Sequence, residues 1–403
     1  MNILFLSLAL INSFSDRGIY SDLARELIKN GHNVFYVCAT ERRNKKKTTL
    51  KTDDYKSFLL TVKTLNIQKT NIFEKGLGTI LITNQFKKAI KKFFKGIKFD
   101  LLLYPTPPIT LYGVVKCFKK RDNAKTYLML KDIFPQNAVD LGLMKTAGIK
   151  GLIYKYFRKQ EKKLYTISDR IGCMSPANVE YVLKHNPEIS KEKVEVFPNC
   201  IEVQDISLTD EEKKQIREKY NLPLDKKIFV YGGNLGKPQD IPFIIDCLKV
   251  ERENEKAFFL IIGDGTEFKK LEQYATESKQ ENFLLLKRLP IDEFDRVLAS
   301  CDVGLIFLNH RFTIPNFPSR LLSYMQAGLP VLACTDVVSD VGTIICKENF
   351  GWFSRSDATK DFDEKINLIE GENIKQKSCN SVNYLKKTYD VRIILNLIFK
   401  KRN

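Results

Sequence analysis

The chain has 403 residues and a net charge of +18, with 43% hydrophobic and 11% aromatic residues. This length predicts two domains, and the apolar content excludes an intrinsically disordered chain. Nine cysteines stand singly, without a CxxC pair or a Cys/His cluster at metal spacing. That usage indicates reduced thiols in a reducing compartment and argues against a disulfide framework or a zinc site.

The positive charge is confined to the first half of the chain. Residues 1–200 carry 36 Lys and Arg against 17 Asp and Glu, whereas residues 201–403 carry 30 against 31. A compositional lysine bias would affect both halves. The asymmetry therefore indicates a polyanionic partner for the first half, namely anionic lipid, a lipid phosphate or nucleic acid.

The first half alternates strands and helices. The apolar opening lacks a basic n-region and a small-residue cleavage site, so we expect a buried strand rather than a signal peptide. A loop at residues 13–18 leads into a helix with one apolar face and Gly31 as its stop; the residues of that face are Leu23, Ala24, Leu27 and Ile28. No run reaches the roughly 18 apolar residues that span a bilayer. Strands are predicted over residues 2–7, 34–39, 99–104, 126–130 and 170–174.

The second half repeats this alternation after a polar stretch at residues 205–227. Its predicted strands are residues 228–231, 258–262, 283–286, 303–307 and 330–334. We predict an α/β fold of two Rossmann-like, doubly wound parallel-sheet domains facing across a cleft. The N-terminal domain spans residues 1–198, the C-terminal domain spans 199–380, and residues 381–403 form a C-terminal helix that packs back on the first domain. The ligand site is expected in the cleft, at the carboxyl ends of the strands.

Two glycine-rich turns follow predicted strands in the second half. In residues 231–237, glycines would let backbone N–H groups approach a phosphate, with Gly233, Asn234 and Lys237 as candidate contacts. Gly263 and Gly265 follow the next strand. Such turns often need glycine for geometry alone, and neither is a Walker A or GxGxxG sequence.

A third motif lies at residues 316–333. Pro318 is typical of a first helical turn and Gly328 of a helix stop, which places Ser319 and Arg320 at the helix start. A hydroxyl and a guanidinium there could hold a diphosphate. The alternative is a surface arginine on an ordinary helix.

These segments together resemble the GT-B glycosyltransferases, specifically the retaining family 4 group and its capsule and O-antigen branch. The resemblance rests on residues 30–34, on Ser175 after a strand, on 196–200 as the interdomain "PNG" stretch, and on 317–333 as "PSK…EYMAAGKPVLA". It implies a nucleoside-diphosphate sugar donor, metal independence and retention at the anomeric carbon.

The chain departs from the family pattern in the donor site. Pro315 and Ser323 stand where the family has two glutamates, and Asn234 and Gln239 stand where it has an arginine and a lysine. Lys237 and Arg320 are expected to supply the phosphate charge instead. The predicted donor-binding residues are Gly233, Asn234, Lys237, Gly263, Gly265, Arg288, Ser319, Arg320 and Ser323.

Two residues are candidate catalytic groups. Asp132 ends a strand near the position where relatives place a His or Asp facing the anomeric carbon, and could accept the acceptor hydroxyl proton. The alternative is a cap on the next helix. His310 follows the strand at 303–307 and is expected to face the donor sugar. Predicted acceptor-binding residues are Asp16, Arg17, Gly18 and Tyr104.

Residues 84–98 predict membrane contact. An apolar stripe at helical spacing, including Phe86, Phe93 and Phe94, is surrounded by six lysines and no acid, as in a helix lying at an anionic interface. The alternative is a Rossmann helix with its stripe in the core. Residues 150–163 add six basic residues against one acid. The predicted membrane residues are Phe86, Lys87, Lys88, Lys91, Lys92, Phe93 and Phe94.

The sequence therefore predicts transfer of a sugar from a nucleoside diphosphate, UDP foremost, to a lipid-linked saccharide in surface polysaccharide biosynthesis. We expect a cytoplasmic enzyme at the inner face of the cell membrane, without a cofactor. A sugar-nucleotide epimerase and a non-catalytic GT-B-like partner remain open. A nucleic-acid partner is not expected, because no recognition motif accompanies the basic residues.

Overall fold

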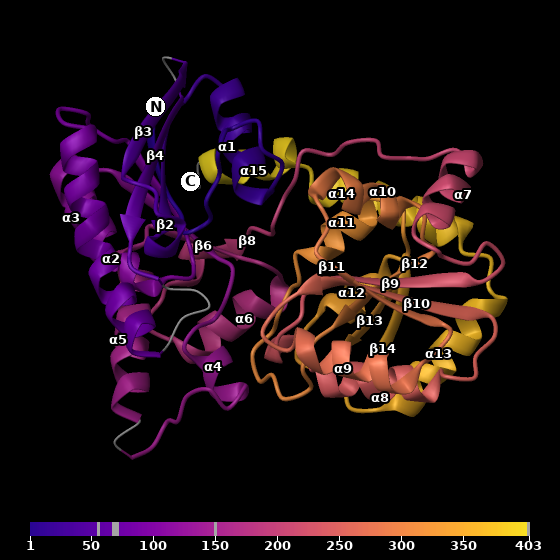
Figure 1. Cartoon of the computed structure of the whole chain (residues 1–403). Coiled ribbons are helices and arrows are strands. Elements are labelled where there is room, and N and C mark those ends of the chain that lie inside the picture. The colour runs from indigo at the N-terminus through magenta and orange to yellow at the C-terminus, as the bar shows by residue number, and fades with distance from the viewer. Residues whose placement is uncertain (55–56, 67–71, 149–150, 401–403) are drawn as a thin grey trace. The chain divides into compact units, whose positions relative to one another are not determined.

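The computed structural model describes residues 1–54, 57–66, 72–148 and 151–400, without the side chains of 53, 54, 72–77, 79 and 80. It divides into two compact units (Figure 1). The N-terminal unit holds residues 1–202 and the segment from Val391 onward, and the C-terminal unit holds residues 203–390. The chain therefore crosses between the units at Glu202 and again at Asp390.

The N-terminal unit is built on an eight-stranded sheet in the order β3-β4-β2-β1-β5-β6-β7-β8, parallel except for β3 against β4. The strands are β1 (Asn2–Leu6), β2 (Asn33–Glu41), β3 (Thr49–Asp54), β4 (Ser57–Thr64), β5 (Leu101–Pro105), β6 (Lys125–Leu130), β7 (Arg170–Cys173) and β8 (Val194–Val196). The α-helices are α1 (Ile19–Lys29), α2 (Ile72–Phe93), α3 (Tyr112–Asp122), α4 (Gln136–Asp140), α5 (Gly151–Ile167), α6 (Pro176–His185) and α15 (Val391–Phe399). Short 3-10 turns are η1 (Arg42–Asn44), η2 (Ile109–Leu111) and η3 (Lys191–Lys193).

The predicted apolar face of α1 is confirmed. Leu23, Ala24 and Leu27 are buried, and the helix packs against α15, whose Ile394 and Leu395 lie in the same core cluster. The Val391 N–H donates to the Ile201 carbonyl at 2.9 Å, which fastens the returning segment at its first residue. The segment that returns begins at Val391 rather than at 381, because α14 (Lys375–Thr388) belongs to the C-terminal unit.

The apolar stripe of α2 is core, which contradicts its assignment to the membrane. Phe86 and Phe94 are 0% and 1% exposed, and the Phe94 ring lies edge-on to Phe35 and Phe99 at 5.1 and 6.3 Å. Packing against the sheet already removes these apolar side chains from water, so they cannot enter a bilayer in this fold. Lys88, Lys91 and Lys92 are exposed, Lys87 and Phe93 are half-buried, and the charged face remains at the surface.

The C-terminal unit contains a six-stranded parallel sheet in the order β11-β10-β9-β12-β13-β14. The strands are β9 (Lys227–Asn234), β10 (Ala257–Asp264), β11 (Phe283–Lys287), β12 (Val303–Phe307), β13 (Val331–Thr335) and β14 (Gly351–Arg355). The helices are α7 (Asp210–Lys219), α8 (Ile241–Val250), α9 (Phe268–Ser278), α10 (Ile291–Ala299), α11 (Arg320–Gln326), α12 (Val341–Lys347), α13 (Thr359–Gly371) and α14, with η4 (Lys237–Gln239).

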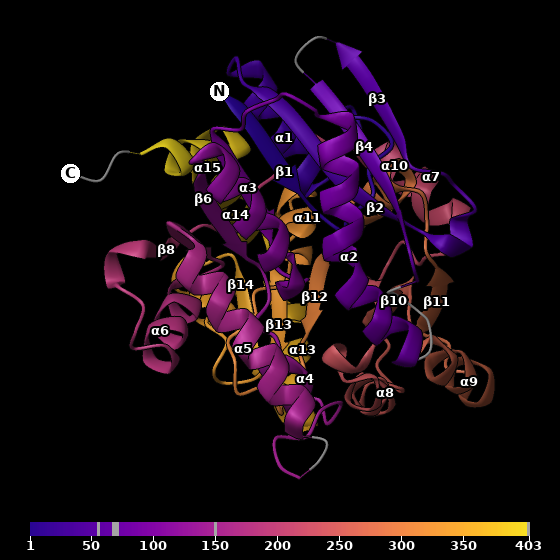
Figure 2. The same cartoon turned by 90° about the vertical axis from the view of Figure 1, so that its left-hand side faces the viewer.

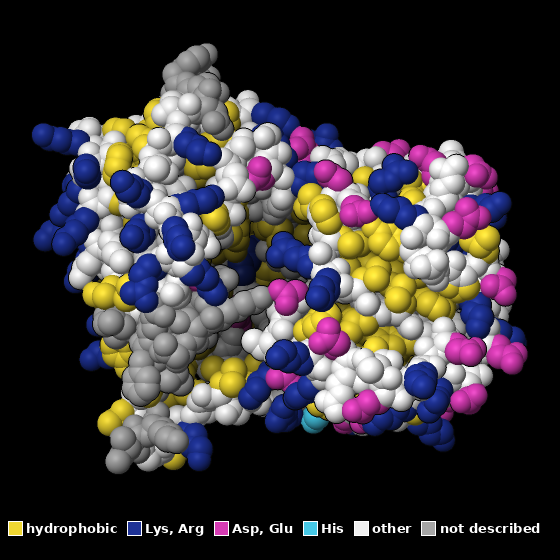
Figure 3. Space-filling view, viewed as in Figure 1, with side chains coloured by type: hydrophobic (Ala, Val, Ile, Leu, Met, Phe, Trp, Pro, Cys, Tyr) yellow, Lys and Arg dark blue, Asp and Glu magenta, His cyan; other side chains and the backbone are white. Residues whose placement is uncertain are grey.

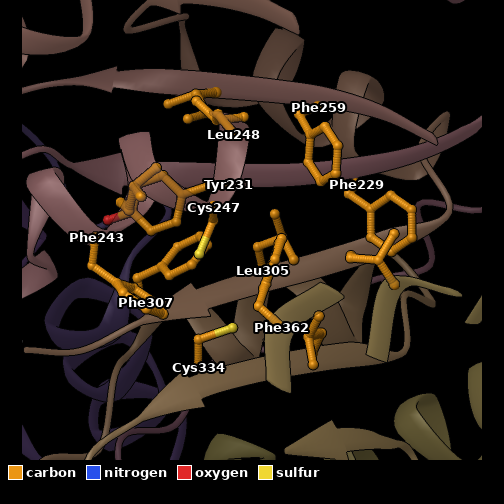
Figure 4. Packing of buried hydrophobic residues seen from close by; sticks show 14 of the residues in the cluster. Phe229, Tyr231, Phe243, Cys247, Leu248, Phe259, Leu305, Phe307, Cys334 and Phe362 are labelled. Atoms are coloured by element: carbon orange, nitrogen blue, oxygen red, sulfur yellow. The ribbon is translucent and has the colours of Figure 1, made fainter. Parts of the chain in front are cut away.

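Aromatic and aliphatic side chains fill the space between this sheet and its helices (Figure 4). Phe229 and Phe259 stack at 5.5 Å on neighbouring strands, and Phe362 of α13 packs against Phe259 at 6.2 Å. The buried strands read as continuous apolar runs because helices cover the sheet. The fold prediction of two parallel-sheet α/β domains is confirmed, while β3, β4, β8 and β14 were not predicted.

Candidate functional site

Arg320, at the start of α11, lies against the glycine-rich turn that ends β9. A Cβ atom on Gly233 would lie 3.1 Å from Arg320 Nη2, so the bare glycine makes room for the guanidinium. The guanidinium carbon also sits 5.2 Å from the centre of the Phe294 ring, which packs on Gly232. Arg320, a predicted donor contact, therefore lies beside the first glycine-rich turn, and Phe294 was not among the predicted residues.

The cation of Arg320 is available for an anion. Its side chain is half-buried, and among the residues that the structure describes no carboxylate lies within salt-bridge distance of it. Tyr324, one turn later, accepts the Gly232 N–H at 2.9 Å and donates to the Leu305 carbonyl at 2.9 Å. These bonds fix α11 to β9 and β12, so Arg320 is held in place next to the turn.

The second glycine turn serves backbone packing in this structure. A Cβ on Gly263 would lie 2.2 Å from the Gly233 carbonyl oxygen, and one on Gly265 would lie 2.1 Å from the Leu235 carbonyl oxygen. The Leu235 N–H donates to the Asp264 carbonyl at 3.0 Å, which joins the two turns. Gly263 and Gly265 thus set the position of the first turn. This is the alternative in which glycine is needed for backbone geometry alone.

Gly263→Ala is expected to lower the free energy of unfolding by about 1–3 kcal/mol even without donor, because neither backbone can move aside cheaply. Chemical denaturation measures this. Gly371→Ala is the matched control, since nothing lies within 4 Å of its added Cβ. Unchanged stability with weakened donor binding would instead make Gly263 a direct ligand contact.

His310 and Lys237 lie on two loops that are joined. The Asn309 N–H donates to the Pro238 carbonyl at 2.8 Å, and its side-chain amide donates to the Lys237 carbonyl at 3.1 Å. His310 Nδ1 lies 3.2 Å from Asp240 Oδ2. Both His310 and Lys237 are exposed, so neither side chain is sequestered from a ligand.

Of the remaining predicted donor residues, Arg288 and Asn234 lie at one edge of the sheet, and Ser319 and Ser323 belong to α11. The strands β11, β10, β9 and β12 are parallel neighbours, so their carboxyl ends meet at the same edge. Arg288 follows β11 and is exposed, as is Asn234, whose amide donates to Gln239 Oε1 at 3.0 Å. Ser319 is exposed at the start of α11, and Ser323 is half-buried one turn later.

In the N-terminal unit, Asp132 occupies the loop after β6. Its Oδ2 accepts from Asn137 Nδ2 at 2.6 Å, and burial raises the pKa of the carboxyl to about 6. The nearby carboxyl of Glu161 adds to this increase in pKa, whereas the Asn137 hydrogen bond opposes it. The helix that follows has Pro135 at its N-cap and no side-chain cap, so Asp132 does not cap it. A carboxyl with this pKa can exchange a proton near neutral pH.

Lys131, adjacent to Asp132, was missed. Its Nζ donates to the Phe197 carbonyl at 3.2 Å and lies 5.0 Å from the Phe197 ring centre. Burial lowers the pKa of this ammonium to about 8. A single lysine in a lysine-rich half of the chain is not a sequence signal. Only its position directly after a buried strand could have predicted Lys131 as a site residue.

The predicted acceptor residues divide into a loop and a core residue. Asp16 Oδ2 accepts the Asn12 N–H at 2.7 Å, and the Gly18 N–H donates to Asp22 Oδ1 at 3.2 Å, so both organise the loop before α1. Arg17 is half-buried there. Tyr104 is wrong as an acceptor contact, because it is fully buried with its hydroxyl 2.7 Å from Ser168 Oγ.

Comparison with known proteins decides the family. Residues 20–205 match Glycosyltransferase Family 4, and residues 212–386 match Glycosyl transferases group 1. The chain belongs to the GT-B glycosyltransferases. The Family 4 match covers most of the N-terminal unit, and the group 1 match covers most of the C-terminal unit.

Curated relatives share low identity with this glycosyltransferase. A probable glycosyltransferase of Pseudomonas aeruginosa, WbjE, is 26% identical over 286 residues, 70% of this chain and 69% of the relative. The putative colanic acid biosynthesis glycosyl transferase WcaI of Escherichia coli K12 is 21% identical over 269 residues, 66% of this chain and 64% of the relative. Among solved structures, Anabaena HepE in complex with UDP-glucose aligns with a TM-score of 0.70 at 13% identity, covering 99% and 98% of the two chains.

Two further findings concern the parts of the glycosyltransferase that the structure describes. Within them, no helix combines the length and apolarity that crossing a bilayer requires. Over the same residues, no three His, Cys, Asp or Glu side chains gather in an arrangement suited to a metal ion.

Proposed function

We propose that this glycosyltransferase moves a sugar from a UDP-sugar to a hydroxyl of a lipid-linked saccharide during surface polysaccharide biosynthesis. The proposal includes retention at the anomeric carbon, no metal cofactor and work at the inner face of the membrane. The observation that carries the donor class is Arg320, a half-buried cation without a described carboxylate partner, placed against the backbone of Gly233.

One solved neighbour supports the donor class, and one curated relative supports a role in polysaccharide biosynthesis. HepE was solved with UDP-glucose, and WcaI is named for colanic acid biosynthesis. Cationic guanidinium groups and backbone N–H groups of glycine turns both favour phosphate oxygens. A nucleoside diphosphate is therefore the leaving group that the Arg320 environment fits.

The reaction needs two things from the protein. The acceptor oxygen forms a bond to the anomeric carbon, and the bond from that carbon to the diphosphate oxygen breaks, with its electron pair leaving on UDP. Arg320 stabilises the negative charge that develops on the departing diphosphate. The acceptor hydroxyl loses a proton, and Asp132, with its pKa raised to about 6, is the group proposed to take it.

A panel of nucleotide sugars tests the proposal. The protein is incubated with each donor and with total lipid-linked oligosaccharide, and both UDP release and glycosylated lipid are measured. We expect one donor to give UDP and glycolipid in equal amounts. Release of UDP with no glycoside would favour the epimerase reading, and no release with any UDP-sugar would contradict the proposed donor.

A further inference from the structure

An open hollow of about 620 Å³ lies on the N-terminal unit, between α5 and the first residue of α3. Most of its lining residues are cationic or aromatic. The lining residues are Tyr112, Tyr154, Lys155, Arg158, Lys159, Lys162, Lys163, Thr166 and Ile167. A hollow of this composition favours an anionic group with apolar neighbours.

The positive charge of the hollow is largely uncompensated. Glu161 is the one acid of α5, and it is buried in contact with Arg158 at 2.5 Å and Tyr165 at 2.8 Å. Lys162 pairs with Glu188 at 3.0 Å at the surface. For Lys155, Lys159 and Lys163 no carboxylate partner lies within salt-bridge distance among the described residues. Lys163 instead sits 5.6 Å from the Tyr112 ring centre.

The first turns of α5 expose apolar side chains beside this hollow. Leu152, Ile153 and Tyr156 are 62%, 55% and 41% exposed. Leu152 and Ile153 lie in the first turn of the helix, and Tyr156 lies in the next turn, three residues before Lys159. This is the reverse of α2, whose apolar stripe is buried. The pairing of exposed apolar residues with lysines is the pattern of a helix at an anionic interface. Lys150, which the sequence analysis grouped with this segment, lies outside the described residues.

The neighbouring helices extend the basic surface. The helices α2, α3 and α5 lie side by side (Figure 2), and α2 and α5 each contact α3. Their exposed lysines include Lys91 and Lys92 on α2 and Lys116 and Lys120 on α3. On the face that Figure 3 shows, Lys and Arg outnumber Asp and Glu over the described part of this unit, while Asp and Glu mix with them over the C-terminal unit.

We propose that α5 docks this protein on a bilayer of anionic phospholipid. The hollow receives the phosphate of a lipid headgroup between Lys155, Lys159 and Tyr112. Leu152, Ile153 and Tyr156 enter the boundary between headgroups and acyl chains, while the lysines of α2 and α3 add attraction without insertion. Charge complementarity selects this occupant, because a neutral protein surface would leave the lysines unpaired. The docking surface does not depend on which sugar is transferred.

Vesicle sedimentation tests the charged part of the surface. We expect binding to vesicles of phosphatidylcholine with phosphatidylglycerol, little binding to phosphatidylcholine alone, and release by salt. Lys155→Glu with Lys159→Glu should weaken the partition coefficient by about tenfold or more. The matched control, Lys91→Glu with Lys92→Glu on α2, changes the charge equally and should weaken it by about threefold or less. Equal losses from the two pairs would overturn the assignment to α5.

A second pair of variants tests insertion. Leu152→Ser with Ile153→Ser should lower vesicle binding by about tenfold without changing net charge. Leu224→Ser with Ile291→Ser is the control, because these residues of the other unit are 52% and 49% exposed. Binding of inorganic phosphate without vesicles, together with unchanged sedimentation of the serine pair, would make the hollow a soluble-anion site and overturn docking. Thermal unfolding of every variant monitors folding without relying on UDP binding, which keeps failure of the donor assignment separate.

Discussion

Asp132→Asn is expected to lower turnover by about 10²-fold or more, the usual scale for loss of a general base. The amide has nearly the shape of the carboxyl and can keep a hydrogen bond with Asn137, but it cannot take a proton. In wild type, kcat/KM should fall as the pH drops through about 6, because burial raises the pKa of Asp132 to about 6 and the base must be ionised. The variant should lack this acid limb. Initial rates from pH 5 to 8 measure both effects.

Stability measurements separate this role from a structural one. The folded-state pKa of Asp132 lies above its ordinary value of 3.8, so ionisation destabilises the fold as the pH rises between these values. Removing the ionisable group should therefore leave the melting temperature near pH 7.5 unchanged or higher. A normal rate combined with a lowered melting temperature would mean that Asp132 holds the loop and does not act on the substrate.

Arg320→Ala is expected to weaken donor binding and kcat/KM by about 10- to 100-fold, since a charge-assisted hydrogen bond is worth about 1.5–3 kcal/mol. The guanidinium packs on Phe294 and Gly233 without a described carboxylate partner, so no internal ion pair is lost with it. Donor titration by calorimetry and steady-state kinetics measure the two quantities.

Two variants sharpen this test. Arg320→Lys keeps the charge but loses the planar fork, so it should recover only part of the affinity. Arg252→Ala removes a surface arginine of the same unit, whose side chain is 53% exposed, and should bind donor like wild type. Wild-type affinity and turnover in Arg320→Ala would make Arg320 a surface residue with no part in donor binding.

Periodicity predicted the sheets well because the parallel strands are long apolar runs separated by helices. The strand β8 has only three residues, and β14, with the sequence GWFSR, ends in Ser and Arg, so neither forms such an apolar run. The residues of α2 show why an amphipathic pattern is ambiguous. Phe86 and Phe94 have the spacing of an interfacial helix and equally that of a core helix, and only their burial, with Phe94 packed on Phe35, distinguishes the two.

The candidate site was predictable where chemistry and chain position coincide. The Gly233 turn follows a strand and Arg320 begins a helix, and both patterns are visible in the sequence. The structure brings the two residues together. Tyr104 was misassigned because its place at a strand end does not reveal that its hydroxyl turns inward to Ser168. The hollow on α5 arises from Tyr112, 42 residues before Tyr154 in the chain, so no local pattern could show it.

The proposed donor site is the edge of the C-terminal sheet around Gly233 and Arg320, where a nucleoside diphosphate binds. Calorimetric titration of UDP into the purified protein tests this assignment. We expect one saturable site per chain, weakened about 10- to 100-fold in Arg320→Ala and unchanged in Asp132→Asn. Absence of saturable binding by UDP, or equal affinity in wild type and Arg320→Ala, would contradict the assignment.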